Sequence, residues 1–334
     1  MRSLSSESKI AGATVKRGSK TRSYLRVGPF FYQKMHIRNY VMIPFTVIRG
    51  AKDGPTLVQT AGCHPTEYAG IDATIRLSNG IKPEELKGTY IAVPCVNIPG
   101  FYERTYINPI DEKNIQGNYP GRTDGTISDL MAYKVFNELV LKANYFLDCH
   151  GGDIHESEIW SFIYYKTEDE IEEKSEAIAK ATGLTHLIKS SYPGSMGMEA
   201  AKRKIPGGLF ELCSGDRLLP EESSAIYDGS INVMRHLGIL DGQPQPIQKQ
   251  PCTTAGQKQE IWATSASAYF TRAGLYHTSV KPGDLLKEGQ VIGTVTDFYG
   301  EVIETIRAPA TGHVLLNIHN PAVKAGDEAI TVHW

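Results

Sequence analysis

The stretch TLVQTAGCHPTEYAG, residues 56–70, contains the transition that decides the fold. Its first half, TLVQTAG, is a short apolar run that predicts a buried β-strand. A His, a Pro and a Glu follow, and helical spacing then continues to Gly80. Side chains at such a turn lie at the end of the strand, where open α/β sheets bind their ligands.

The same alternation of strand and helix continues along the chain. Residues 1–50 are rich in alternating, β-like stretches, and Ser128 is a fair N-cap for one of the helices. Further strands are predicted at 88–97, 145–153, 186–190 and 207–215, and helices at 128–144, 169–183 and 221–240. Strands separated by helices of ten or more residues predict an α/β fold whose sheet is covered on both faces.

The sequence changes character near residue 245. The segment DGQPQPIQKQP, residues 241–251, is rich in Pro and Gln and reads as a linker. Short strands and frequent turns follow to the end of the chain. We therefore predict two domains, an α/β domain over 1–245 and a small all-β domain over 246–334.

Composition excludes several classes of protein. The chain has 334 residues, 41% of them hydrophobic and 22% charged, with a net charge of −2. This balance is typical of a globular protein and gives no indication of nucleic-acid or membrane binding. No apolar leader or span is apparent, and the five Cys are scattered. We expect free thiols, mostly buried, and a cytoplasmic location.

His64 and Glu67 are candidate metal ligands, because both follow the strand at 56–62. His150 follows another predicted strand, in LDCHGGD, and would complete a His₂Glu set, which is a catalytic zinc ligand set. The alternative is that His64 is a polar loop residue, Glu67 a carboxylate at a helix N-terminus, and His150 a strand-end residue.

Glu211 lies in the apolar run GGLFELCSG, residues 207–215. A carboxylate inside a buried strand is costly unless it is paired or functional. It is a candidate general base for a metal-activated water, and the alternative is an outward-facing residue on an edge strand. The aromatic pair Tyr164 and Tyr165 is predicted to belong to the core.

Several segments together resemble the succinylglutamate desuccinylase/aspartoacylase family, a branch of the zinc carboxypeptidase-like hydrolases. In chain order they are GCHPTEYAG (62–70), NIPGFYERT (97–105), NPIDEKN (108–114), YPG (119–121), LDCHGGD (147–153), GGLFELCSG (207–215) and the C-terminal stretch from GLYHTSV (274–280) to APATGHVL (308–315). The resemblance implies a mixed sheet flanked by helices and a small C-terminal β domain similar to biotinyl or lipoyl domains.

The resemblance also implies roles for individual residues. His64, Glu67 and His150 would bind one Zn²⁺ per chain, and Glu211 would act as general base and proton shuttle. Arg104 would polarise the scissile carbonyl and hold the oxyanion, a role suited to a fixed guanidinium.

The chain departs from the family at one important position. Asn114 fits the family pattern, but the following Asn-Arg pair is replaced by Gln116 and Gly117. That Arg binds the substrate's α-carboxylate in the family, and Gly cannot. Arg122 and Lys113 are the nearby candidates to replace it, unless both are ordinary loop charges. Asn114, Gln116 and Arg122 are thus the predicted substrate-binding residues.

These features predict a zinc-dependent amidohydrolase that removes an acyl group from a small N-acylated amino acid or amine, cleaving a C–N bond other than a peptide bond. Two alternatives remain open: a related zinc hydrolase acting on a peptide, ester or C–C bond, and a metal-binding homologue without catalysis. The expected partner is a small molecule, with no nucleic acid and no membrane, and a homo-oligomer is plausible.

Overall fold

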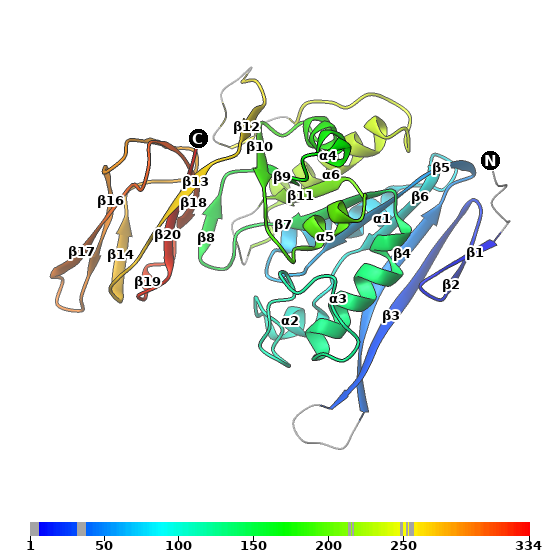
Figure 1. Cartoon of the computed structure of the whole chain (residues 1–334), viewed down its shortest axis with the longest axis horizontal. Helices are drawn as coiled ribbons and strands as arrows, with labels where there is room; N and C mark the ends of the chain where they lie inside the picture. Colours follow the sequence, from blue (N-terminus) through cyan, green and yellow to red (C-terminus); the bar gives the residue numbers. More distant parts are fainter. Residues whose placement is uncertain are drawn as a thin grey trace.

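The structure is a computed structural model that describes residues 7–31, 38–212, 215, 217–247, 250, 251, 253 and 257–334 (Figure 1). Among these residues, nine strands form one large sheet in the order β12-β10-β9-β11-β7-β5-β6-β4-β3. The strands are β3 (Ser19–Phe31), β4 (Arg38–Arg49), β5 (Lys52–Ala61), β6 (Lys87–Val93), β7 (Tyr145–His150), β9 (Ser161–Tyr165), β10 (His186–Ser190), β11 (Gly207–Glu211) and β12 (Glu260–Trp262). A small hairpin of β1 (Glu7–Ile10) and β2 (Ala13–Lys16) precedes them.

Helices cover both faces of the large sheet. The helices are α1 (Tyr68–Gly80), α2 (Ile98–Glu103), α3 (Ile127–Glu138), α4 (Glu170–Ala181), α5 (Met196–Lys202) and α6 (Pro220–His236). Residues of α1, α4 and α6 share one buried cluster with Leu57 and Leu147, whereas α3 and α5 share another with Val58 and Phe146. Neighbouring strand residues thus face opposite sides of the sheet, as the pleat requires.

Smaller antiparallel sheets form the C-terminal part. One contains β13 (Ser265–Tyr269), β20 (Glu328–His333), β18 (Gly312–Ile318) and β15 (Leu285–Leu286), and the other contains β17 (Val302–Arg307), β16 (Val291–Thr296), β14 (Gly274–Thr278) and β19 (Ala322–Val323). Between them lies a separate apolar core that includes Ile292, Val314 and Ile330. The predicted fold class, a mixed sheet flanked by helices with a small C-terminal all-β part, is confirmed.

The two parts exchange strands. The short strand β8 (Glu156–Glu158) pairs with β18 of the C-terminal part, although it lies between β7 and β9 in the chain (Figure 1). In return, β12 comes from the segment after residue 245 and pairs in parallel with β10 at the edge of the large sheet. The C-terminal part is therefore attached through backbone hydrogen bonds as well as through side-chain packing.

Local details differ from the sequence-based expectation. The helix predicted over 128–144 begins with Thr126 as its N-cap and ends at Glu138, followed by a 3₁₀ turn at Val140–Lys142. Ser128 lies inside the helix, and its hydroxyl donates to Asp111, so the predicted cap is wrong. The cap is Thr126 because Asp129, three residues on, accepts from its backbone N–H at 2.8 Å.

The predicted thiols are partly described. Cys63, Cys95 and Cys149 are buried and free, as expected, while Cys213 and Cys252 lie outside the described residues. Nowhere in the described chain does a helix have the length and apolar character needed to cross a membrane.

A ring cluster joins the large sheet to the C-terminal part. The Trp262 ring on β12 lies 4.7 Å from His186, 5.6 Å from His313 and 6.1 Å from His333, measured between centroids. The Nδ1 atoms of His186 and His333 are buried without hydrogen-bond partners among the described residues. Burial lowers the pKa of both imidazoles, that of His333 to about 4, and the charge of Glu260 partly opposes the effect at His186.

We predict that acid destabilises this junction. Below a pH of about 6.5 the unfolded chain protonates His333, but in the folded chain the pKa of His333 is about 4. The contribution of His333 to the free energy of unfolding is therefore fully present above about pH 6.5. It falls by up to about 3 kcal/mol as the pH drops toward 4. Urea unfolding of wild type and His333→Phe at pH 7.5, 6.0 and 5.0 measures the difference.

The His333→Phe variant is expected to lose less stability between pH 7.5 and 5.0 than wild type. The matched control is His236→Asn, since His236 is exposed at the end of α6. Equal pH dependence in wild type and His333→Phe would contradict the assignment.

Candidate active site

The three predicted metal ligands lie together at the carboxyl ends of neighbouring parallel strands. His64 follows β5, His150 is the last residue of β7, and these two strands pair in parallel. Glu67 immediately precedes α1, as its N-cap. One ligand atom from each residue lies within 4.8 Å of the others, and all three side chains are buried. The sequence prediction of a shared site thus agrees with their geometry.

A glycine shapes the turn that presents His64. Gly62 has a φ of +63°, a left-handed conformation that residues with a Cβ rarely adopt. A Cβ at this position would lie 3.0 Å from the Cα of Cys95 and 3.1 Å from Ile71. The chain can therefore turn sharply after β5 and place His64 and Glu67 on the same side.

Both histidines direct the same ring nitrogen toward Glu67. Nδ1 of His64 lies 2.8 Å from one carboxylate oxygen of Glu67, and Nδ1 of His150 lies 3.1 Å from the other. Their Nε2 atoms face outer acceptors, the amide oxygen of Asn114 at 2.9 Å and the carboxylate of Asp148 at 3.0 Å. Outer acceptors of this kind fix the tautomer of a metal-binding imidazole, so the donor set fits a divalent cation.

Asp148 is itself held in place. Its Oδ1 accepts from the Thr60 hydroxyl at 2.7 Å and from the Cys149 backbone N–H at 3.1 Å, which leaves Oδ2 for His150. Burial alone would lower the pKa of His150, but the carboxylates of Asp148 and Glu67 raise it well above its ordinary value. Positive charge therefore stabilises these buried carboxylates, and either a protonated imidazole or a bound cation supplies it.

Glu211 lies beside the metal-binding group. It is the last residue of β11, which runs parallel to β7 and pairs Glu211 directly with His150. Glu211 lines the same cavity of about 200 Å³ as His64, Glu67 and His150. Burial raises the pKa of Glu211 to about 8. The charge of His150 lowers this pKa, and the negative charge of Glu67 raises it further.

Two further carboxylates reach this cavity from β8. Glu156 and Glu158 are two positions apart on the strand, so their side chains point to the same face of it. Both line the cavity. Burial raises the pKa of Glu156 to about 7, and burial followed by repulsion from Glu211 raises that of Glu158 well above its ordinary value. The sequence analysis missed both residues, although two acids spaced two apart in HESE, residues 155–158, were a usable signal.

Asn114 and Gln116 line the cavity, as their predicted substrate-binding roles require. The amide of Gln116 lies 3.4 Å from Nε2 of His150, and its oxygen accepts from the Met196 backbone N–H at 3.3 Å. Gly117 has a φ of +93°, and a Cβ there would meet the Tyr192 hydroxyl at 3.3 Å. Tyr192, which also lines the cavity, therefore lies against the position that carries Arg in the family pattern.

The predicted cationic residues lie elsewhere. Arg104 is exposed at the C-cap of α2 with a φ of +57°, and it is not among the residues that line the cavity. Arg122 is also exposed and lies 3.8 Å from Asp129, which Lys113 contacts at 2.9 Å. The described geometry does not bring Arg104, Arg122 or Lys113 to the metal-binding group, and their predicted roles remain predictions.

Aromatic side chains complete the cavity wall. The Tyr106 ring stacks on the His64 ring at 3.9 Å between centroids, which fixes the imidazole plane. Tyr165 is buried, as predicted for a core residue, but it also lines the cavity. Tyr106 was not found from the sequence because no pattern distinguishes an aromatic loop residue that stacks on a ligand from one that covers the core.

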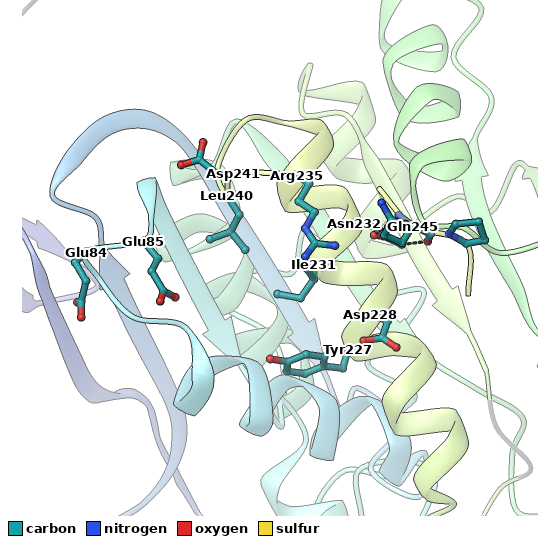
Figure 2. Close-up of a pocket in the computed structure, with 11 residues that line it drawn as sticks. Glu84, Glu85, Tyr227, Asp228, Ile231, Asn232, Arg235, Leu240, Asp241 and Gln245 are labelled. Carbon is teal, nitrogen blue, oxygen red and sulfur yellow. Dashed lines mark hydrogen bonds between the residues drawn. The ribbon is translucent and has the colours of Figure 1, made fainter. Parts of the chain in front are cut away.

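A larger cavity of about 760 Å³ lies between α6, the segment that follows it and the loop that contains Glu84 and Glu85 (Figure 2). Its carboxylates, among them Glu84, Asp228 and Asp241, stand apart around the opening rather than converging. No His or Cys lines it. The smaller cavity, which carries the ligand set and Glu211, is therefore the candidate active site.

We predict that Glu67→Gln loses the metal. The substitution keeps the shape of the side chain but removes the charged ligand between the two imidazoles, so affinity for Zn²⁺ is expected to fall more than about 100-fold. Calorimetric titration of metal-free protein with zinc measures this. Glu173→Gln on the exposed face of α4 is the matched control. Equal zinc affinity in Glu67→Gln and wild type would refute the ligand assignment.

A second prediction concerns Asp148. Asp148→Asn keeps the volume of the side chain but replaces a charged acceptor with a neutral amide, which can present either its oxygen or its NH₂ group to Nε2 of His150. Zinc affinity is therefore expected to fall about 10- to 100-fold. The same titration measures the loss, and far-UV circular dichroism checks that the sheet is intact. A variant that binds zinc as tightly as wild type would show that Asp148 does not orient His150.

Comparison with known proteins agrees with this geometry. Residues 53–237 match the model of the succinylglutamate desuccinylase/aspartoacylase catalytic domain. The chain is 28% identical over 296 residues to an N-alpha-acetyl-L-2,4-diaminobutyric acid deacetylase from Halomonas elongata, covering 86% of this chain and 84% of that one.

Solved structures share the fold. The product-bound ectoine utilization protein EutE (DoeB) from Ruegeria pomeroyi superposes with a TM-score of 0.86 at 23% identity, covering 95% of this chain and 96% of that one. A succinylglutamate desuccinylase from a Silicibacter species gives 0.84 at 23% identity, covering 94% of each chain. Since the family model matches more than half of its length, the chain belongs to the succinylglutamate desuccinylase/aspartoacylase family.

Proposed function

We propose that this protein is a zinc-dependent amidohydrolase that removes an acyl group from a small N-acylated amine or amino acid. One observation carries the proposal: a buried His64–Glu67–His150 group and the carboxyl group of Glu211 line one small cavity. Three protein ligands from two His and one Glu are typical of a catalytic zinc site, which keeps a further position for water or substrate.

Each residue has a definite task in this proposal. Bound zinc would polarise the amide carbonyl and lower the pKa of the attacking water. Glu211 takes a proton from that water as it attacks the amide carbon, and then delivers the proton to the departing nitrogen. Asp148 and Asn114 hold the two imidazoles in the tautomer that keeps each Nδ1 free for the metal.

The relatives support the type of reaction. The Halomonas elongata protein is named a deacetylase, and the matching family model is named for a desuccinylase and an acylase. Hydrolysis of an amide on a small amine is common to these names. Arg104 is the residue that the family resemblance assigns to the oxyanion, but it is exposed and does not line the cavity.

We predict that Glu211→Gln retains zinc and loses turnover. The substitution removes the proton acceptor but no metal ligand, so kcat is expected to fall about 10²- to 10⁴-fold while zinc stoichiometry is unchanged. A panel of N-acetyl, N-formyl and N-succinyl amines and amino acids, followed by mass spectrometry, measures hydrolysis. Glu173→Gln on α4 serves again as the exposed control.

Two results would count against the proposal. Near-normal turnover in Glu211→Gln would remove Glu211 as the base. Failure of the zinc-loaded wild type to cleave any amide, with cleavage of esters or peptides instead, would favour a related hydrolase, and no cleavage at all would favour a non-catalytic metal-binding protein.

A further inference from the structure

The charges around the cavity point to a particular kind of substrate. Resting on the proposed function, we infer that the amine which this protein deacylates carries a second, positively charged amino group and needs no carboxylate. Its chemical class is an N-acylated diamine. Glu156 and Glu158, which line the same cavity as the metal-binding residues, bind the free ammonium group.

Apart from two histidines, the ionisable groups with ordinary charge near neutral pH that line the cavity are carboxylic acids. Four glutamates line it, and no Lys or Arg does. Glu67 belongs to the metal-binding group and Glu211 is the proposed base, so each has a use in hydrolysis. The carboxyl group of Glu158 contacts that of Glu211, but neither Glu156 nor Glu158 has an assigned step in hydrolysis, and an anionic substrate would have to approach both without a compensating Lys or Arg.

The two remaining glutamates lack positive partners. No Lys or Arg forms an ion pair with Glu156 or Glu158 within the described part of the chain. One oxygen of Glu156 accepts from the Asp153 backbone N–H at 3.0 Å. The carboxyl group of Glu158 contacts that of Glu211, another acid, and its Oε2 is buried without a hydrogen-bond partner among the described atoms. A carboxylate buried in this way is costly unless a cation or donor reaches it, and an ammonium group supplies both.

A second metal ion is a poorer occupant than an ammonium group. The described residues contain one group of His, Cys, Asp or Glu close enough to share an ion, and it is His64, Glu67 and His150. Glu156 and Glu158 are not part of it. Two carboxylates that line one cavity and belong to no such metal-binding group suit a ligand with several N–H donors, such as –NH₃⁺.

Backbone pairing fixes these glutamates in position. β8 pairs with β18 through Glu156 opposite Ile318 and Glu158 opposite Leu316. Residues on a paired strand are held more rigidly than residues on a free loop. The C-terminal part of the chain thus contributes to the cavity through β8, without itself supplying a side chain to the lining.

The place where a carboxylate would be bound is closed. Gly117 replaces the family Arg, its φ is +93°, and Tyr192 lies against it. The two nearby cations, Lys113 and Arg122, lie beside Asp129 at the start of α3. With a volume of about 200 Å³ the cavity is also smaller than the range of about 300–1,000 Å³ for drug-sized ligands, which suits a short diamine.

Three acetamides of equal length test the charge preference. N-acetyl-1,4-diaminobutane, N-pentylacetamide and 5-acetamidopentanoate differ only in a cationic, neutral or anionic end group. With zinc-loaded full-length protein, kcat/KM for the cation is expected to exceed that for the other two about 10- to 100-fold, the value of one charge-assisted contact. Equal rates, or fastest cleavage of the anion, would overturn the inference and leave the deacylase function intact.

Variants identify the residues that carry the preference. Glu156→Gln and Glu158→Gln are each expected to reduce the ratio of cation to neutral substrate toward one, mainly through KM. Glu156→Lys is expected to reverse the ratio of cation to anion, a gain that misfolding cannot produce. Glu173→Gln should retain the wild-type ratio. An unchanged ratio in all three Glu156 and Glu158 variants would refute the assignment.

A binding measurement separates this inference from the proposed function. Calorimetry of zinc-loaded Glu211→Gln with the same three acetamides reports the charge preference with little turnover. Preferential binding of the cationic acetamide, weakened when Glu156→Gln is added, would support the cation site even if wild type cleaved no amide. Equal binding of the three acetamides, or a second zinc ion per chain that Glu156→Gln abolishes, would refute it.

Discussion

The carboxylate of Glu67 is almost completely buried, with 1% of its residue surface exposed, and it lies between two imidazoles. A buried carboxylate is tolerated only when positive charge or hydrogen bonds surround it. One hydrogen-bond network surrounds this carboxylate. It consists of the two histidines, their outer acceptors Asn114 and Asp148, and the Thr60 hydroxyl, which donates to Asp148. The parallel pairing of β5, β7 and β11 brings their carboxyl ends together at one edge of the sheet. The same strand pairing therefore forms the sheet and assembles the candidate active site.

Much of this arrangement could be predicted from the sequence because it depends on strand ends. An apolar run predicts a buried strand, and a His or Glu directly after it must lie at the edge of the sheet. His64, Glu67 and His150 are of this kind. The sequence predicts Glu211 inside the strand at 207–215, but β11 ends at Glu211, and all four residues line one cavity. The alternation of strands and helices likewise predicted a sheet covered on both faces.

The remainder depends on contacts between distant segments. Thr126 caps α3 with Asp129, and Ser128 lies inside the helix, where its hydroxyl donates to Asp111, a residue of another loop. The placement of Glu156 and Glu158 depends on the pairing of β8 with β18, about 160 positions further along the chain, and no local pattern reveals that partner. Arg104 and Arg122 are loop residues, and spacing alone does not determine where a long side chain points.

Gly117 and Gly194 allow two backbone segments beside the cavity to pack closely together. The Tyr119 backbone N–H donates to the Gly194 carbonyl at 2.9 Å, and a Cβ on Gly194 would lie 2.4 Å from the Gly117 carbonyl oxygen. Neither backbone can therefore change without the other. Placing an arginine at position 117 would therefore require changing both segments together, because the backbone there adopts a glycine conformation and packs directly against Gly194.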